Sequence, residues 1–215
     1  MSTLLHRSAA LALVTLTLAT LPLAGCGGLL SNPTPRSLYQ VAAATSFAPG
    51  LPHTAAQLTI GPVDAPAGLD TTRIALSRTP LSLDYFADVA WSDRTPAMVR
   101  TALLASAQNS GAFAAVGSDT FNLRADYLLK TELRDFEAVY DSQRAGPTAT
   151  VEMSLTLVKL PGDTVAAQTV VSQRQPAASN AIPDIVGAFN TALDKTLQQA
   201  VGWAAGHAAL PPSRR

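Results

Sequence analysis

The 215-residue sequence predicts a mixed α/β domain in which helices pack against a central β-sheet. Two stretches have apolar residues at helical spacing, residues 95–111 and residues 180–207. Between them, residues 125–173 alternate apolar and polar side chains, as strands with one buried face do. Short connections between these strands favour an antiparallel meander. This order of elements is typical of helices that cover a sheet.

The first 25 residues have the pattern of a cleaved secretory signal peptide. His6 and Arg7 precede a stretch without charge, residues 8–24, whose core is apolar and whose end carries small residues. The alternative is a transmembrane anchor, which needs about 20 apolar residues. Pro22, Gly25 and Gly27 interrupt the apolar stretch at its end, which favours the signal peptide.

Cys26 is the predicted lipidation site, because residues 23–26, LAGC, resemble the bacterial lipobox. The resemblance implies that the Cys26 thiol is alkylated with diacylglycerol and that its freed amine is acylated, for example with palmitate. Cys26 is the only cysteine, so the alternatives are a free thiol or an intermolecular disulfide. Gly27, in place of an aspartate after the cysteine, favours the outer membrane by the same resemblance. Residues 26–37 read as a lipidated tether that spans at most about 35 Å.

Strands are expected in the proline-rich N-terminal half at residues 38–43, 57–63 and 73–77, with a strand or turn at 81–86. Leu58, Ile60 and Pro62 follow period two in the second of these strands. The first helix is expected to be capped by Thr95 and to end at Gly111. A short buried strand at 113–116 follows it.

The meander is predicted in more detail. Period two runs through Tyr127 to Leu133 and then shifts phase at Phe136, which predicts a β-bulge near Asp135. Residues 151–157 form the second strand, residues 161–163 supply turn chemistry, and residues 164–173 form the third strand.

The last helix is expected to be capped by Asn180, with Pro183 and Asp184 in its first turn. Its continuous apolar stripe predicts core packing, and the alternative is a face offered to a partner or to lipid. Residues 38–207 are therefore interpreted as a single domain, and residues 208–215 as a disordered tail.

Charge excludes two classes of partner. Fifteen Lys and Arg residues balance fifteen Asp and Glu residues, and removal of Arg7 with the signal peptide leaves a net charge of −1. Binding to nucleic acid or to anionic lipid by bulk charge needs a basic excess. No nucleic-acid partner is therefore expected.

Catalytic and cofactor-binding motifs are not found in the sequence. The two histidines after Cys26, His53 and His207, have no metal-ligand spacing, and there is no nucleophile elbow or phosphate loop. Two acidic groups, 84–93 and 135–141, could share a proton or bind a hard cation. Neighbouring arginines favour solvated ion pairs instead. The sequence thus predicts a protein that is not an enzyme, without metal or cofactor.

Tyr85, Phe86 and Trp91 bunch before the first helix and are the candidate partner-contact residues. The alternative is that these aromatic side chains belong to the core.

These features together resemble the ABC-type transport auxiliary lipoprotein family over residues 37–205. They are the lipobox, the early strand LYQV at 38–41, the segment LDYFADVAW at 83–91, and the meander followed by a C-terminal helix. The resemblance implies a three-layer α/β sandwich with a mixed central sheet, and a non-catalytic lipoprotein on the periplasmic leaflet of the outer membrane. It implies association with a mammalian-cell-entry (MCE) domain protein and its ABC transporter, which move lipids or other hydrophobic molecules.

Two alternative functions stay open. One is a structural or assembly lipoprotein of another envelope complex, such as a secretion or polysaccharide-export machine. The other is a lipid-anchored hydrolase with widely spaced catalytic residues. Self-association into a homo-oligomer is also expected.

Overall fold

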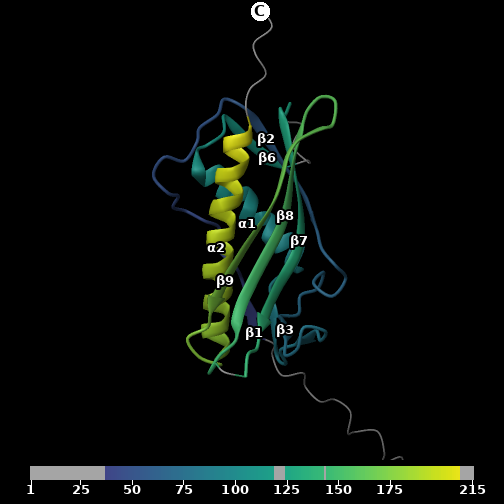
Figure 1. The fold of residues 1–215 in the computed structure, drawn as a ribbon, viewed down its shortest axis with the longest axis vertical. Coiled ribbons are helices and arrows are strands. Elements are labelled where there is room, and N and C mark those ends of the chain that lie inside the picture. The colour runs from purple at the N-terminus through teal and green to yellow at the C-terminus, as the bar shows by residue number, and fades with distance from the viewer. Residues whose placement is uncertain (1–36, 119–123, 143, 209–215) are drawn as a thin grey trace, which may run out of the picture. The chain divides into compact units, whose positions relative to one another are not determined.

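The computed structural model describes residues 37–118, 124–142 and 144–208 (Figure 1). These residues belong to one unit, Pro35–Arg215. The predicted signal peptide, Cys26, nearly all of the tether and residues 209–215 lie outside the described residues.

One long strand organises the main sheet. Strand β7 pairs with β8 along one edge, and β8 pairs with β9, so the three form the predicted antiparallel meander. The other edge of β7 is shared, because its first half pairs with β2 and its last three residues pair with β3, both in parallel. Strands β6 and β4 extend β2 and β3. The strands are β2 (Gln57–Asp64), β3 (Ala75–Ser77), β4 (Asp84–Tyr85), β6 (Ala115–Ser118), β7 (Tyr127–Val139), β8 (Thr148–Lys159) and β9 (Thr164–Pro176).

The bulge predicted near Asp135 is confirmed. The register between β7 and β8 shifts between Leu133 and Asp135, so that Leu133 and Phe136 both face the core. A second shift was not predicted. The register of β2 on β7 changes between Ile60 and Val63. Val63 is therefore the buried residue there, and the expectation for Pro62, which is exposed, is wrong.

Both helices cover the same face of the sheet (Figure 1). Helix α1 (Thr95–Ser110) packs on β2 and β6, and helix α2 (Ile182–His207) packs on β8 and β9. The two helices also contact each other. The opposite face of β7 carries the exposed residues Lys130, Glu132 and Arg134. The apolar stripe of α2 is thus buried against the sheet, as its core-packing interpretation predicts.

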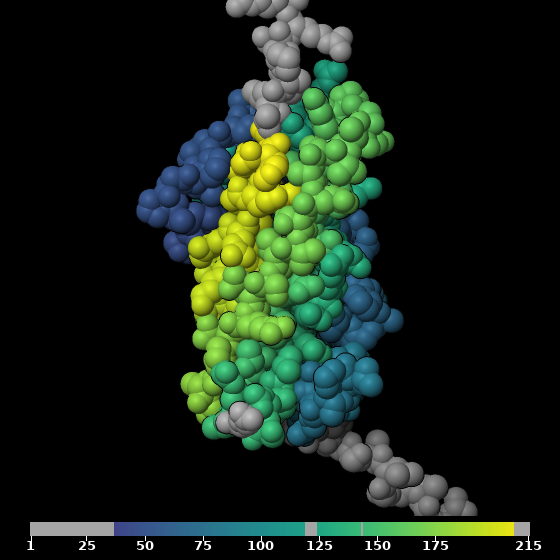
Figure 2. Space-filling model, viewed as in Figure 1, coloured from purple at the N-terminus to yellow at the C-terminus, as the bar shows by residue number. Residues whose placement is uncertain are grey.

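The N-terminal segment lies across the helices. Strand β1 (Ser37–Tyr39) pairs with β5 (Val89–Trp91) in a small parallel sheet, and the predicted strand 38–43 is not continued beyond Tyr39. Instead, the backbone N–H of Ala42 donates to Asn190 of α2, and that of Ala44 donates to Ser106 of α1, both at 2.8 Å. In Figure 2 the dark blue residues that follow this segment lie against the yellow α2, where residues 47–52 line a pocket with it.

Because both helices lie on the same face, the sheet and the helix pair form two layers, rather than the three that the resemblance implies. With its mixed sheet, meander and two helices, the structure confirms the predicted α/β sandwich. Short elements differ at their ends. The strand expected at 113–116 is β6, two residues later, and Phe113 is a buried residue of the turn before it.

The predicted caps differ from the observed ones. Thr95 is already inside α1, and its hydroxyl donates to the carbonyl of Thr71 at 3.1 Å rather than capping the helix. Asn180 does not cap α2, because its side chain accepts a hydrogen bond of 2.6 Å from the Tyr140 hydroxyl. Gly111 ends α1 in the left-handed conformation, with φ of 60°, as predicted.

Two glycines give a matched pair of stability predictions, because an added Cβ would meet no atom within 4 Å at either. We expect Gly111→Ala to lower the free energy of unfolding by about 1 kcal/mol, since a left-handed residue with a side chain is strained. We expect Gly187→Ala, in the exposed interior of α2, to raise it by about 1 kcal/mol. Urea denaturation of both variants measures the two changes in the free energy of unfolding. If both variants change stability in the same direction, the backbone conformations given to Gly111 and Gly187 are wrong.

Candidate functional site

The three predicted contact residues do not share one environment. Trp91 is only 1% exposed, and its ring centroid lies 5.6 Å from that of Phe136 and 5.4 Å from that of Phe189. The expectation that Trp91 contacts a partner is therefore corrected, because a side chain this deeply buried presents no surface. Tyr85 and Phe86 are half-buried and lie at the surface beside it in sequence.

Tyr85 and Phe86 belong to the β3–β4 hairpin, residues 75–86. The Tyr85 hydroxyl donates to the carbonyl of Gly68 at 2.9 Å, and the Arg73 guanidinium carbon lies 3.5 Å from the Tyr85 ring centroid. The Phe86 ring lies 6.4 Å from the ring of Tyr140. Both aromatic side chains thus connect the hairpin to neighbouring residues, while part of each ring remains exposed.

The tip of this hairpin, residues 78–83, exposes two leucines. The Ser82 hydroxyl accepts from the backbone N–H groups of Arg78 and Thr79 and so holds the turn. Leu81 is fully exposed at 100%, and Leu83 is 42% exposed. Figure 2 shows the blue part of the chain that carries the hairpin standing out at the lower right of the surface.

Tyr140 connects the hairpin to the start of α2. Its hydroxyl donates to Asn180, and the Arg78 guanidinium carbon lies 5.0 Å from its ring centroid. Burial raises the pKa of Tyr140, and the nearby positive charge of Arg78 partly offsets that rise. The hydroxyl therefore stays protonated and keeps its hydrogen bond at neutral pH.

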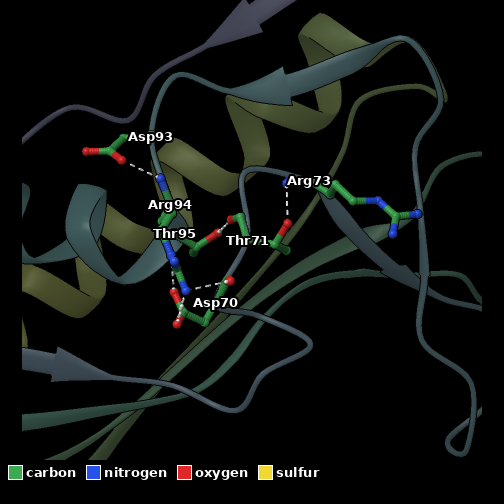
Figure 3. A network of polar contacts seen from close by, with 6 residues as sticks. All are labelled: Asp70, Thr71, Arg73, Asp93, Arg94 and Thr95. Carbon is green, nitrogen blue, oxygen red and sulfur yellow. Dashed lines mark hydrogen bonds and ion pairs between the residues drawn. The ribbon is translucent and has the colours of Figure 1, made fainter.

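A polar network holds the loop behind the hairpin against α1 (Figure 3). The Arg94 guanidinium donates from Nε to Oδ1 of Asp70 at 2.7 Å and also contacts Oδ2 of the same carboxylate. One residue further on, the Thr95 N–H donates to the Thr71 carbonyl at 3.0 Å. The hydrogen bond to Asp70 raises the pKa of Arg94 above its usual value, so the guanidinium keeps its positive charge at physiological pH.

The two predicted acidic groups are placed differently. Asp135, Glu137 and Asp141 line one open cleft of about 470 Å³, together with Arg144 and Arg174. Asp93, from the other group, lines a different pocket beside α1 and accepts a hydrogen bond from the backbone N–H of Arg94. Among the described residues, no three acidic, histidine or cysteine side chains converge as a metal site requires.

Glu137 is a partly buried carboxyl group in this cleft. Partial burial raises its pKa above the ordinary 4.5, the negative charge of Asp135 adds to the rise, and a hydrogen bond of 3.1 Å from the Ser77 hydroxyl opposes it. The folded protein therefore binds this proton more tightly than the unfolded chain does. This contribution to stability is complete below pH 4.5 and is lost as the pH rises through the folded-state pKa.

We expect Glu137→Gln to be more stable than the unmodified protein at neutral pH and equally stable under acidic conditions. The glutamine side chain stays neutral and still offers Ser77 an acceptor oxygen. Urea midpoints of both proteins between about pH 4 and pH 8 test this. A difference that is constant across the range would show that ionisation of Glu137 is not its cause.

The sequence model of the ABC-type transport auxiliary lipoprotein component matches residues 37–201, which run from β1 into the last turns of α2. The chain belongs to this family. No curated protein matches the auxiliary lipoprotein.

Solved structures repeat the fold. Protein XCC0632 from Xanthomonas campestris is 26% identical, with a TM-score of 0.74, and the match covers 80% of this chain and 95% of that one. An uncharacterised protein is 15% identical with a TM-score of 0.59, covering 80% and 99% of the two chains. The hypothetical protein CT253 from Chlamydia trachomatis is 8% identical with a TM-score of 0.50, covering 72% and 98%.

Membership in the family makes the auxiliary lipoprotein a membrane-anchored protein of the cell envelope that associates with an ABC transporter. Within the part of the chain that the structure describes, no helix has the length and apolar character needed to cross a membrane.

Two features of the site were not predicted. Residues 81–86 were expected to form a strand or turn, and nothing was predicted about the exposure of Leu81 and Leu83. The turn former Pro80 directly before Leu81 was the available signal. The pairing of Asp70 with Arg94 joins residues 24 positions apart, and no local pattern indicates it.

Proposed function

We propose that this auxiliary lipoprotein is a non-catalytic component of an MCE-type ABC transport system, held at the periplasmic side of the outer membrane. In this role it docks the transporter and helps lipids or other hydrophobic molecules cross the periplasm. The observation that carries the proposal is the family match over residues 37–201, which covers nearly all of the described elements.

The proposed anchor is a lipid on Cys26. Ten residues separate Cys26 from Ser37, the first residue of β1. The Ser37 N–H donates to the Asp88 carbonyl at 3.2 Å, directly after the hairpin. An extended tether of ten residues reaches at most about 35 Å, so the domain works close to its membrane.

The proposed contact with the transporter uses the exposed parts of Tyr85 and Phe86. Half-buried aromatic side chains bind partners well, because they lose little conformational freedom and cover a large area. The Asp70–Arg94 pair and the Tyr85–Gly68 hydrogen bond hold the hairpin in one conformation before a partner arrives.

Affinity purification of the full-length lipoprotein from detergent-solubilised envelopes tests the proposal. We expect an MCE-domain protein and subunits of an ABC transporter to co-purify, and deletion of the gene to alter membrane lipid balance and detergent resistance. Recovery of a secretion or polysaccharide-export complex instead, with unchanged lipid balance, would favour the alternative of a structural or assembly lipoprotein.

Self-association is proposed at the outer edge of β9. Among the described strands β9 pairs only with β8, and its residues 164–173 carry no charge that would discourage pairing. Val170 is 46% exposed on this strand. We expect Val170→Lys to shift the solubilised protein toward monomer in light scattering after size exclusion, since added lysines block edge pairing. If the wild type is oligomeric and the Val170→Lys variant has the same mass, the interface lies elsewhere.

A further inference from the structure

We propose that the hairpin tip, residues 78–83, is a second membrane contact, with Leu81 inserted into the lipid surface to which the chain is anchored. This inference rests on the proposed lipid anchor at Cys26. It assigns a lipid-binding role to a loop separate from the aromatic side chains proposed to meet the transporter.

Position supports this contact. The tether enters the domain at Ser37, whose N–H is bonded to Asp88, and Phe86 nearby is bonded through its N–H to the Ile74 carbonyl at 3.0 Å. Leu81 and Phe86 are five positions apart in the sequence, so their backbones are at most about 18 Å apart. In Figure 1, β1 and β3 both lie toward the lower end of the domain.

Exposure supports it as well. Among the described residues, five large apolar side chains are exposed, and three of them lie at this end: Leu38 at 64%, Leu81 at 100% and Leu83 at 42%. The other two, Val165 and Val170, lie on β9. Leu81 is fully exposed on a turn that hydrogen bonds hold in place. Its apolar surface is therefore removed from water only when another surface covers it.

The chemistry of the tip fits a lipid surface. Residues 77–83 include one charged side chain, Arg78, and no acidic one. An arginine beside an inserted leucine can meet lipid phosphates while its stem lies along apolar surface. The near-neutral charge of the whole chain means that apolar insertion, rather than bulk attraction to anionic lipid, makes the contact.

A second copy of the chain or a protein partner is the competing occupant of the tip. The lipid surface is favoured because the tether of ten residues keeps this end of the domain within reach of the bilayer at all times. Both Leu81 and Ser37 are at the end where β7 finishes, since β3 pairs with residues 137–139.

The test uses the full-length lipidated protein in phosphatidylcholine vesicles. Because diacylglycerol blocks the Cys26 thiol, Leu81→Cys provides the one free thiol for the environment-sensitive dye NBD, and Pro80→Cys places the dye beside an intact Leu81. We expect a blue shift of NBD emission at both positions and quenching by lipids brominated on the acyl chain. Ala166→Cys is the matched control, exposed on β9 near the end where β7 begins, and should stay in water.

Each outcome decides the matter. NBD that stays in water at positions 80 and 81, in protein whose mass shows acylated Cys26, overturns the tip contact and leaves the proposed anchor standing. A blue shift without quenching by brominated lipid indicates protein contact and also overturns it. An unmodified Cys26 overturns the anchor and, with it, the inference.

Discussion

Trp91→Ala is expected to lower the free energy of unfolding by about 3–5 kcal/mol, the usual cost of truncating a large buried aromatic side chain. Trp91 is 1% exposed and meets Phe136 and Phe189 edge-on, while those two rings stack on each other at 4.9 Å. The substitution leaves a cavity where β5, β7 and α2 meet. Thermal and urea unfolding of the purified domain measure the loss.

Trp91→Phe is the matched control. It keeps an aromatic ring between Phe136 and Phe189, and it removes the indole N–H, which has no acceptor among the described residues. Loss of an unsatisfied buried donor offsets part of the lost volume, so we expect a much smaller effect than for Trp91→Ala. If Trp91→Ala instead left stability unchanged and weakened partner recovery, Trp91 would be a contact residue after all.

Cys26→Ser is expected to abolish membrane anchoring. Each methylene of an attached acyl chain contributes about 0.8 kcal/mol to membrane binding, and serine cannot accept the diacylglycerol that the lipobox resemblance assigns to the thiol. Fractionation of cells and intact-mass measurement should show the protein without lipid and without a stable membrane association. The described domain begins at Ser37 and is expected to fold unchanged.

Ser31→Ala, in the same tether, is the control for Cys26→Ser. It changes one small side chain without removing the acceptor thiol, so the lipid and the membrane fraction should be retained. Membrane retention of Cys26→Ser at the wild-type level would contradict lipid anchoring through this residue.

The features of the fold that depend on neighbouring residues were predicted correctly from the sequence. The bulge near Asp135 followed from a change of phase between Leu133 and Phe136, and Gly111 ended α1 because its backbone conformation favours glycine. The buried face of β8, from Val151 to Leu157, followed from strict alternation. In each case the signal lies within a few residues.

Long-range contacts explain what could not be predicted. Segment 40–44 does not extend β1, because Asn190 and Ser106 on the two helices bind its backbone. Asn180 is not a cap because Tyr140, 40 residues earlier, takes its side-chain oxygen. Trp91 is buried because Phe136 of β7 and Phe189 of α2 pack against it, and both residues are distant in the sequence.

The candidate site was predicted in part. The aromatic segment at 83–91 indicated the right region, and Tyr85 and Phe86 do reach the surface there. The exposed leucines of the neighbouring turn, and the Asp70–Arg94 pair that fixes the loop behind it, came from the structure alone.

Photo-crosslinking in living cells tests the docking role most directly. The crosslinking amino acid p-benzoylphenylalanine replaces Phe86, the half-buried ring of the hairpin, and in a control replaces Thr191, which is exposed on α2. Docking to an MCE-type ABC transporter predicts a crosslinked product from position 86 that contains an MCE-domain protein or a transporter subunit, and none from position 191. Products from position 86 that contain only components of another envelope complex, or no product at all, would contradict it.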